Sequence, residues 1–188
     1  RDPKIQGLGL AAARDVVSHL RYDAAAIAIT GVPLTHTLGL GISQAGRYLR
    51  EHLSSGFNRD EAGRRVFDGV FSHIAGAGRV FLNELFAQPW RTNTQHEDHD
   101  FPENHFPFST ASCHDPITGA RASLLRADDA DVRVIESNTA TEYWQKGASL
   151  LHTDPLGQRD LALPENARVY LIAGTQHGGR SGLGTERG

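Results

Sequence analysis

The feature that most constrains the fold is an alternation of short apolar segments with segments of helical periodicity. Strands are predicted where β-branched, aromatic and other apolar residues cluster between turn residues, at 36–41, 68–74, 132–136 and 167–174. Helices are predicted where apolar residues recur at helical spacing, from 2 to about 22, at 44–55 and at 142–151. A strand, helix, strand, helix, strand order is typical of an α/β fold built on a parallel sheet.

The composition narrows the class of protein further. The 188 residues fit one domain, 1–188, and 39% of them are hydrophobic, which is ordinary for a globular chain. No apolar run approaches the ~18 residues that a membrane span needs, so we expect no membrane partner. The net charge of -3 and the scattered basic residues give no reason to expect a nucleic-acid partner. A single cysteine, Cys113, excludes an internal disulfide and a four-cysteine zinc site.

Regular periodicity fades over residues 77–126, which we call the insertion. Four prolines, several histidines and several aromatic residues interrupt it. Loops longer than ordinary connections are often functional, so we interpret the insertion as a lid-like excursion. Phe101, Phe106 and Phe108 are predicted to line an acyl or aromatic substrate pocket. Packing of the same rings against the core explains them equally well.

The insertion also holds the densest group of possible metal ligands. His96 and His99 are separated by two acidic residues, a spacing that two zinc ligands could use. The H-E-x-x-H spacing is absent, and Pro102 and Pro107 argue against a supporting helix. A hydrated loop is therefore the better interpretation, and we predict neither a metal site nor a cofactor.

The sharpest local motif is the turn from Gly41 to Gly46, GISQAG, between a predicted strand and a predicted helix. A nucleophile elbow, G-x-S-x-G, needs this context, because it holds the serine above the strand ends. Ala45 stands at the second small position, so the strict motif is not met. Ser43 is the predicted nucleophile, and the Gln44 backbone N–H is the predicted oxyanion donor at the helix start. The alternative is a plain tight turn with a serine near the helix start.

A serine nucleophile needs a base oriented by a carboxylate, and in this type of fold the order is serine, acid, histidine. His177 follows the last predicted strand and is the predicted base. Glu136, Glu142 and Asp154 compete as the acid. Glu142 also completes the capping box of a helix, and Asp154 suits a turn before Pro155, so the residues alone leave the acid open.

Long segments of the chain resemble a bacterial family of alpha/beta-hydrolase domain proteins. They are QGLGLAAARDVVSHLRY, GLGISQAGRYLREHLSSGFNRDEAGRRVFDGVFSHIAGAGR, FPFS, TATEYWQKGASLLHTDP and LPENARVYLIAGTQHGG. The resemblance implies an α/β-hydrolase fold and a serine hydrolase of a small acyl or ester substrate. It maps the nucleophile to Ser43, the base to His177 and the acid to Glu142, which favours Glu142 over Glu136.

This kind of sheet normally has several strands before the elbow strand, and a loop after one of them supplies a second oxyanion donor. Residues 1–35 contain a predicted helix and a short apolar run, without such strands. Together with an arginine at position 1 and no methionine, this predicts the C-terminal part of a hydrolase. The alternative function is a catalytically incomplete fragment or a binding module that retains part of the fold.

Overall fold

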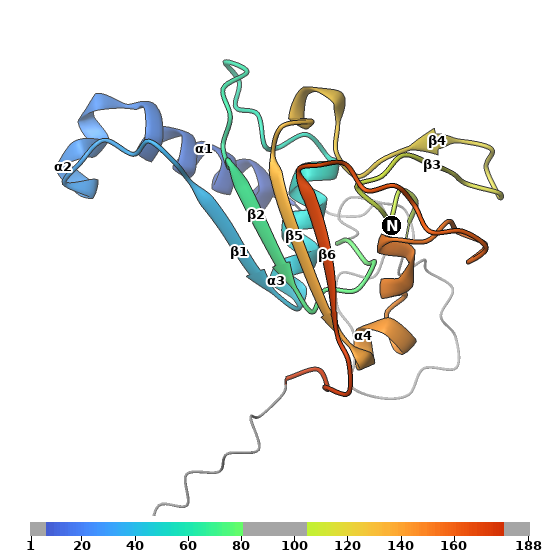
Figure 1. The fold of residues 1–188 in the computed structure, drawn as a ribbon. Helices are drawn as coiled ribbons and strands as arrows, with labels where there is room; N and C mark the ends of the chain where they lie inside the picture. Colours follow the sequence, from blue (N-terminus) through green and yellow to red (C-terminus); the bar gives the residue numbers. More distant parts are fainter. Residues whose placement is uncertain (1–6, 81–104, 179–188) are drawn as a thin grey trace, which may run out of the picture.

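The computed structural model describes residues 7–80 and 105–178. Its main feature is a four-stranded parallel sheet in the order β1-β2-β5-β6 (Figure 1). The strands are β1 (Leu38–Ile42), β2 (Gly69–His73), β5 (Arg133–Thr139) and β6 (Ala167–Ile172). The predicted α/β class and parallel sheet are confirmed. Because all four strands run the same way, the loops after them gather at one edge.

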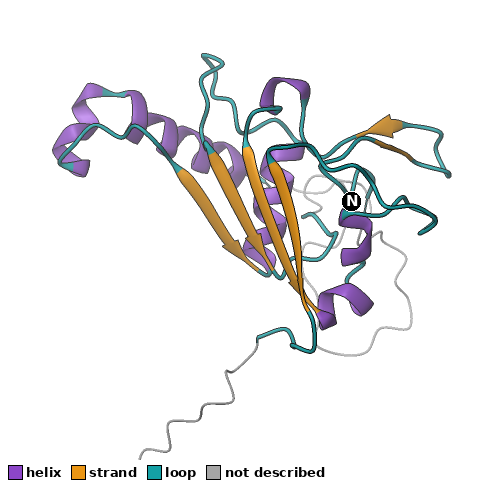
Figure 2. Ribbon diagram, viewed as in Figure 1, coloured by secondary structure: helices purple, strands orange, loops and turns teal. Residues whose placement is uncertain are grey.

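The helices are α1 (Leu8–Tyr22), α2 (Ile27–Thr30), α3 (Gln44–Ser54) and α4 (Ala140–Gln145). Short 3-10 turns, η1 (Ala24–Ala26), η2 (Ala127–Asp129) and η3 (Ala148–Leu151), connect them to neighbouring segments. The helix α3 packs on β1 and β2, and Figure 2 shows it behind the sheet. None of the helices in the described ranges is both long and apolar enough to cross a membrane.

The core lies between α3 and the sheet. Leu49 and Leu53 of α3 meet Val70 of β2 and Val134 of β5 there, and Val17 of α1 packs against this cluster. In β1 the two inward positions are glycines, which lets α3 lie close against the strand. The spacing of small and large residues therefore fixes where the helix after Ser43 sits.

Two sequence predictions about the third strand and its helix were wrong in extent. The predicted strand 132–136 continues to Thr139, so Glu136 lies within β5 rather than at its end. The predicted single helix 142–151 is broken into α4 and η3, because Gly147 takes the left-handed conformation (φ 63°) that ends a helix. The longer strand carries the chain three residues further before α4 begins.

Part of the insertion is described. Its return segment forms the two-residue strands β3 (Cys113–His114) and β4 (Arg121–Ala122), which pair antiparallel. Cys113 is buried and free. Phe101, His96 and His99 lie outside the described residues. No cluster of three or more metal-ligating side chains occurs within 7–80 and 105–178.

The sheet face opposite α3 carries many exposed apolar side chains and is uncovered by the described residues. Its exposed side chains come from all four strands: Leu38, Leu40, Ile42, Phe71, Ile135, Tyr170 and Ile172. β1 is the outermost strand on its side, so its outer backbone groups have no strand partner among the residues described.

A buried histidine in α3 predicts how stability responds to pH. His52 is fully buried against Tyr48, Phe57 and Phe67, and burial lowers its pKa to about 4, with Arg14 adding to the effect. The folded state therefore holds the ring neutral. The contribution of His52 to stability is fully present above its unfolded pKa of ~6.5, and it is lost as the pH falls toward 4.

We expect His52→Phe to flatten the pH dependence of urea unfolding in this window, where the histidine accounts for about 3 kcal/mol. His36→Phe, at an exposed position, is the control and should leave the wild-type slope. An unchanged slope in His52→Phe would contradict the prediction.

Candidate active site

Ser43 lies in a strained turn between β1 and α3. Its backbone has φ 56° and ψ -116°, a region that few residues other than glycine adopt. Its N–H donates to the His73 carbonyl (2.8 Å), and its carbonyl accepts the Arg47 N–H (3.1 Å). The strand ladder and the first helical turn thus fix this conformation from both sides.

The turn is possible because small residues surround it. A Cβ on Gly41 would lie 2.4 Å from the Ala45 carbonyl oxygen, and a Cβ on Gly46 would lie 2.8 Å from Ser72 Oγ. Both separations are shorter than van der Waals contact. The glycines therefore permit the close approach of strand and helix, with Ala45 in the remaining small position.

This packing predicts a steep cost for Gly41→Ala. The new methyl group would meet backbone atoms, which cannot move aside without changing the turn, so we expect a loss of about 2–3 kcal/mol in unfolding free energy. Gly39→Ala, two residues earlier in β1, meets only the flexible ends of Leu49 and Phe67 and should cost about 1 kcal/mol or less. Urea denaturation of both variants checks this, and equal losses would contradict it.

His177 reaches Ser43 from the loop after β6. Its Nε2 lies 3.0 Å from Ser43 Oγ, although 134 residues separate the two in the chain. The His177 backbone N–H donates to Thr141 Oγ1 (3.3 Å), which ties this loop to the start of α4. The side chain of His177 remains 40% exposed, so the ring is accessible from solvent.

Glu142 completes the group with its two carboxylate oxygens in different roles. Oε1 lies 2.5 Å from His177 Nδ1, and Oε2 accepts the Thr139 N–H (3.0 Å) and the Thr139 hydroxyl. The side chain is fully buried. The capping box and the contact with the histidine, which are alternatives on sequence grounds, occur together.

The electrostatics keep this carboxylate charged. Burial by itself raises the pKa of Glu142, but the hydrogen bonds from Thr139 and His177 outweigh it and lower the pKa below its usual value. An ionised carboxylate only accepts hydrogen bonds, so Nδ1 of His177 carries the proton. In the neutral ring Nε2 is then the acceptor for the Ser43 hydroxyl.

The competing carboxylates have other partners. Glu136 is buried on the α3 side of β5 and pairs with Arg50. Asp154 accepts the backbone N–H of Gln158 (2.7 Å) in a turn. Neither has a described contact with His177.

Gln44 is the first residue of α3. The backbone N–H at this position has no carbonyl partner within the helix, so it is available to an anion. The predicted oxyanion donor therefore directly follows the serine.

The predicted pocket residues are less closely joined to this group. Phe106 and Phe108 are half-buried, and their rings meet edge to face with centroids 5.9 Å apart. Phe108 packs against the cluster of Ala77, Ala148 and Leu151. No described contact links either ring to Ser43 or His177. Their role in binding substrate stays a prediction.

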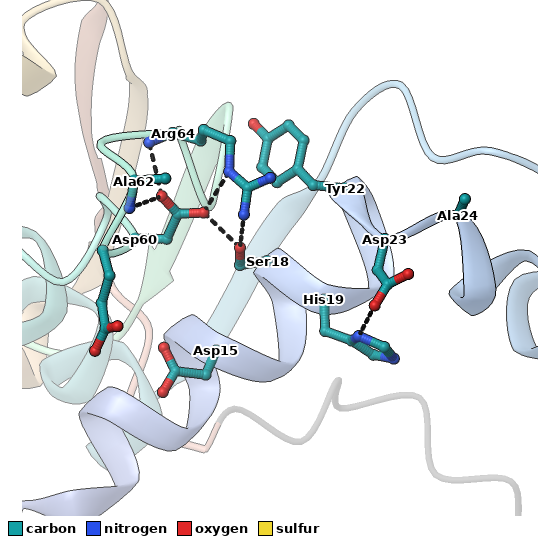
Figure 3. Close-up of a pocket in the computed structure, with 10 residues that line it drawn as sticks. Asp15, Ser18, His19, Tyr22, Asp23, Ala24, Asp60, Ala62 and Arg64 are labelled. Atoms are coloured by element: carbon teal, nitrogen blue, oxygen red, sulfur yellow. Dashed lines mark hydrogen bonds and ion pairs between the residues drawn. The ribbon is translucent and has the colours of Figure 1, made fainter.

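A separate cavity lies between α1 and the turn at 60–64 (Figure 3). It measures about 530 Å³, and Asp60 within it is held by Ser18, Arg64 and the Ala62 N–H. None of its lining residues belongs to the Ser43 group. Ser18, Asp60 and Arg64 bond one another there, which gives these three side chains a structural role.

Sequence reasoning missed the supporting residues. The pattern T-x-x-E indicates Thr139 only as a helix cap, not as a partner of the candidate acid. Nothing in the sequence marks Thr141 as the partner of the histidine loop. The hydrogen bond from Ser43 N–H to the His73 carbonyl could not be predicted either, because it depends on which strands pair.

The parallel sheet and its packed helices define an α/β fold. The serine turn lies at the carboxyl end of the edge strand β1. A family model described as alpha/beta hydrolase domain matches residues 3–187. The chain belongs to this family, as its resemblance predicts, and has the hydrolase-type fold. Comparisons with curated proteins and with solved structures gave no match.

Proposed function

We propose that the protein is a serine hydrolase that cleaves an ester or related acyl bond through Ser43, His177 and Glu142. The observation that carries this proposal is the continuous chain of hydrogen bonds from Ser43 Oγ through His177 to Glu142. Nucleophile, base and orienting acid in this order are the arrangement that acyl transfer needs. No cofactor enters the proposed reaction.

In the proposed mechanism Ser43 Oγ attacks the substrate carbonyl carbon while His177 Nε2 takes the hydroxyl proton. Glu142 stays ionised and stabilises the imidazolium that forms. The Gln44 N–H donates to the oxyanion. His177 then protonates the leaving group, and water repeats the sequence on the acyl-enzyme to release the acid and restore the serine.

The experiment that tests this proposal is covalent capture by a fluorophosphonate, followed by peptide mapping. Ser43 Oγ would bond to phosphorus as fluoride leaves and its proton passes to His177. We expect a single adduct, and it should map to the peptide that contains Ser43. An adduct elsewhere, or none, would overturn the assignment.

A second candidate is a catalytically incomplete site, favoured by the outer edge of β1, which pairs with no strand among residues 7–80 and 105–178. That edge adjoins Ser43, and Leu38 and Leu40 beside it are 78% and 66% exposed. The described residues supply one backbone oxyanion donor, Gln44 N–H. In this second proposal, a polypeptide segment paired with β1 provides the other donor and completes the site.

Hydrolysis of p-nitrophenyl acetate separates the two candidates. A complete site should turn over many times, whereas loss of one oxyanion donor slows the reaction by about 10²–10³-fold. Because the donor serves acylation as well as deacylation, slow release from the first turnover onward, without a burst, would support the incomplete site. Sustained turnover would exclude it.

A further inference from the structure

One buried arginine lies where several parts of the site's framework meet. Arg50 of α3 is 1% exposed, and all three guanidinium nitrogens have partners. Nη1 pairs with Glu136 Oε1, and Nε donates to the Gly78 carbonyl (3.2 Å). Nη2 donates to the carbonyls of Ala77 (3.1 Å) and Phe108 (2.5 Å). A single side chain thus holds one carboxylate and three backbone carbonyls.

These partners belong to separate elements of the site. Arg50 itself stands about two turns after Ser43 on the same helix. Glu136 lies on β5, the strand that leads to Glu142. Gly78 lies near the start of the insertion, and Phe108 lies in its return segment. Arg50 therefore connects the serine helix to the acid-bearing strand and to both sides of the insertion.

Phe108 is the partner that the sequence predicts to line a substrate pocket. Its ring packs against Leu151 and Ala148 beside α4, and Phe106 meets it edge to face. Both rings are only half-buried, so part of each apolar surface remains available. The hydrogen bond from Arg50 fixes the Phe108 backbone relative to the helix that carries Ser43.

The chemistry at position 50 requires an arginine. A guanidinium presents five donors in a rigid planar fork, which matches several acceptors at once. A lysine keeps the charge that Glu136 needs but cannot reach three carbonyls and a carboxylate together. Arg50→Lys therefore loosens the attachment of Phe108 without leaving a buried carboxylate unpaired.

We propose that Arg50 is a positioning residue that fixes Phe108 relative to Ser43 and so sets how the site discriminates between short and long acyl chains. This inference rests on the proposed function. It differs from a role in stability alone because it predicts a change in selectivity between two reagents that react with the same serine.

The test compares the rates at which a short-chain and a long-chain alkyl fluorophosphonate label Ser43. In each reaction Oγ bonds to phosphorus, fluoride leaves and the proton passes to His177. We expect Arg50→Lys to lower the ratio of long-chain to short-chain rates by about tenfold, since one buried methylene is worth about fourfold in binding.

Arg21→Lys is the matched control. Arg21 is another arginine that bridges segments, although it is only partly buried, and it donates to Asp68 Oδ1 (3.0 Å) and the Thr35 carbonyl (3.1 Å). These partners precede β1 and β2, at the edge of the sheet away from Ser43. We expect this variant to lose stability and to keep the wild-type rate ratio.

Phe108→Leu provides an independent variant that leaves the arginine in place. It should lower the ratio in the same direction, and Arg50→Lys should add little to it, because both changes act through one ring. An unchanged ratio in Phe108→Leu, or equal shifts in Arg50→Lys and Arg21→Lys, would overturn the inference alone. Failure of wild-type Ser43 to react with either reagent would overturn the proposed function and this inference with it.

Discussion

Ser43→Ala is expected to abolish fluorophosphonate labelling and to lower ester hydrolysis by a factor on the order of 10⁶. The loss is this large because the serine, the histidine and the acid act as one unit, and without Oγ no covalent intermediate can form. Fold stability should be nearly unchanged, since the hydroxyl contacts His177 at a partly exposed position. Intact-mass measurement after labelling and a p-nitrophenyl ester assay check the result.

The same edge of the sheet offers a matched control. Ser137 of β5 also bonds a histidine ring, with its Oγ 2.7 Å from His73 Nδ1. No described carboxylate orients that histidine, so Ser137 lacks the third member of the group. We expect Ser137→Ala to label like the wild type, and labelling that persists in Ser43→Ala would exclude Ser43 as the nucleophile.

Glu142→Gln is expected to lower the labelling rate by about 10⁴-fold, because the neutral amide neither stabilises the imidazolium nor fixes the productive tautomer. Glutamine can still accept the Thr139 N–H in the capping box, so we expect a stability loss of only about 1 kcal/mol at neutral pH. Labelling kinetics and urea unfolding of the same samples measure the two effects separately.

Thr139→Val is the matched variant that removes only the hydrogen bond from the capping hydroxyl to this carboxylate. It deletes the hydroxyl donor while the contact between Glu142 Oε1 and His177 Nδ1 remains. We expect a stability loss of about 1 kcal/mol with a rate within about tenfold of the wild type. The interpretation of Glu142 as the orienting acid fails if the two variants lose rate equally.

The lowered pKa of Glu142 also gives this comparison a defined pH dependence. The carboxylate is charged more readily in the folded state than in the unfolded state, so its contribution to stability is present above its unfolded pKa of ~4.3. That contribution is lost as the pH falls through the folded pKa. The stability difference between the wild type and Glu142→Gln should therefore shrink under acidic conditions.

Much of the fold was predictable because local signals agree with the tertiary structure. Gly56 takes a positive φ just after α3, the conformation in which a glycine commonly ends a helix. The strands are apolar and bounded by turn residues, so three of them lie within about two residues of their predicted positions. The end of β5 was missed because pairing with β6, whose register runs to Thr139, extends it through polar residues.

The sequence by itself determined the order of strands and helices, and it predicted the serine turn with Ser43 as nucleophile and His177 as base, while the acid stayed open among three carboxylates. Parallel strands bring their carboxyl ends to one edge, so Ser43, Glu142 and His177 could be expected near one another. Only the tertiary structure decided that Glu136 turns toward Arg50 while Glu142 meets His177. The physical reason is that the length and pairing of β5 fix which carboxylate emerges beside the histidine, and no local pattern encodes that register.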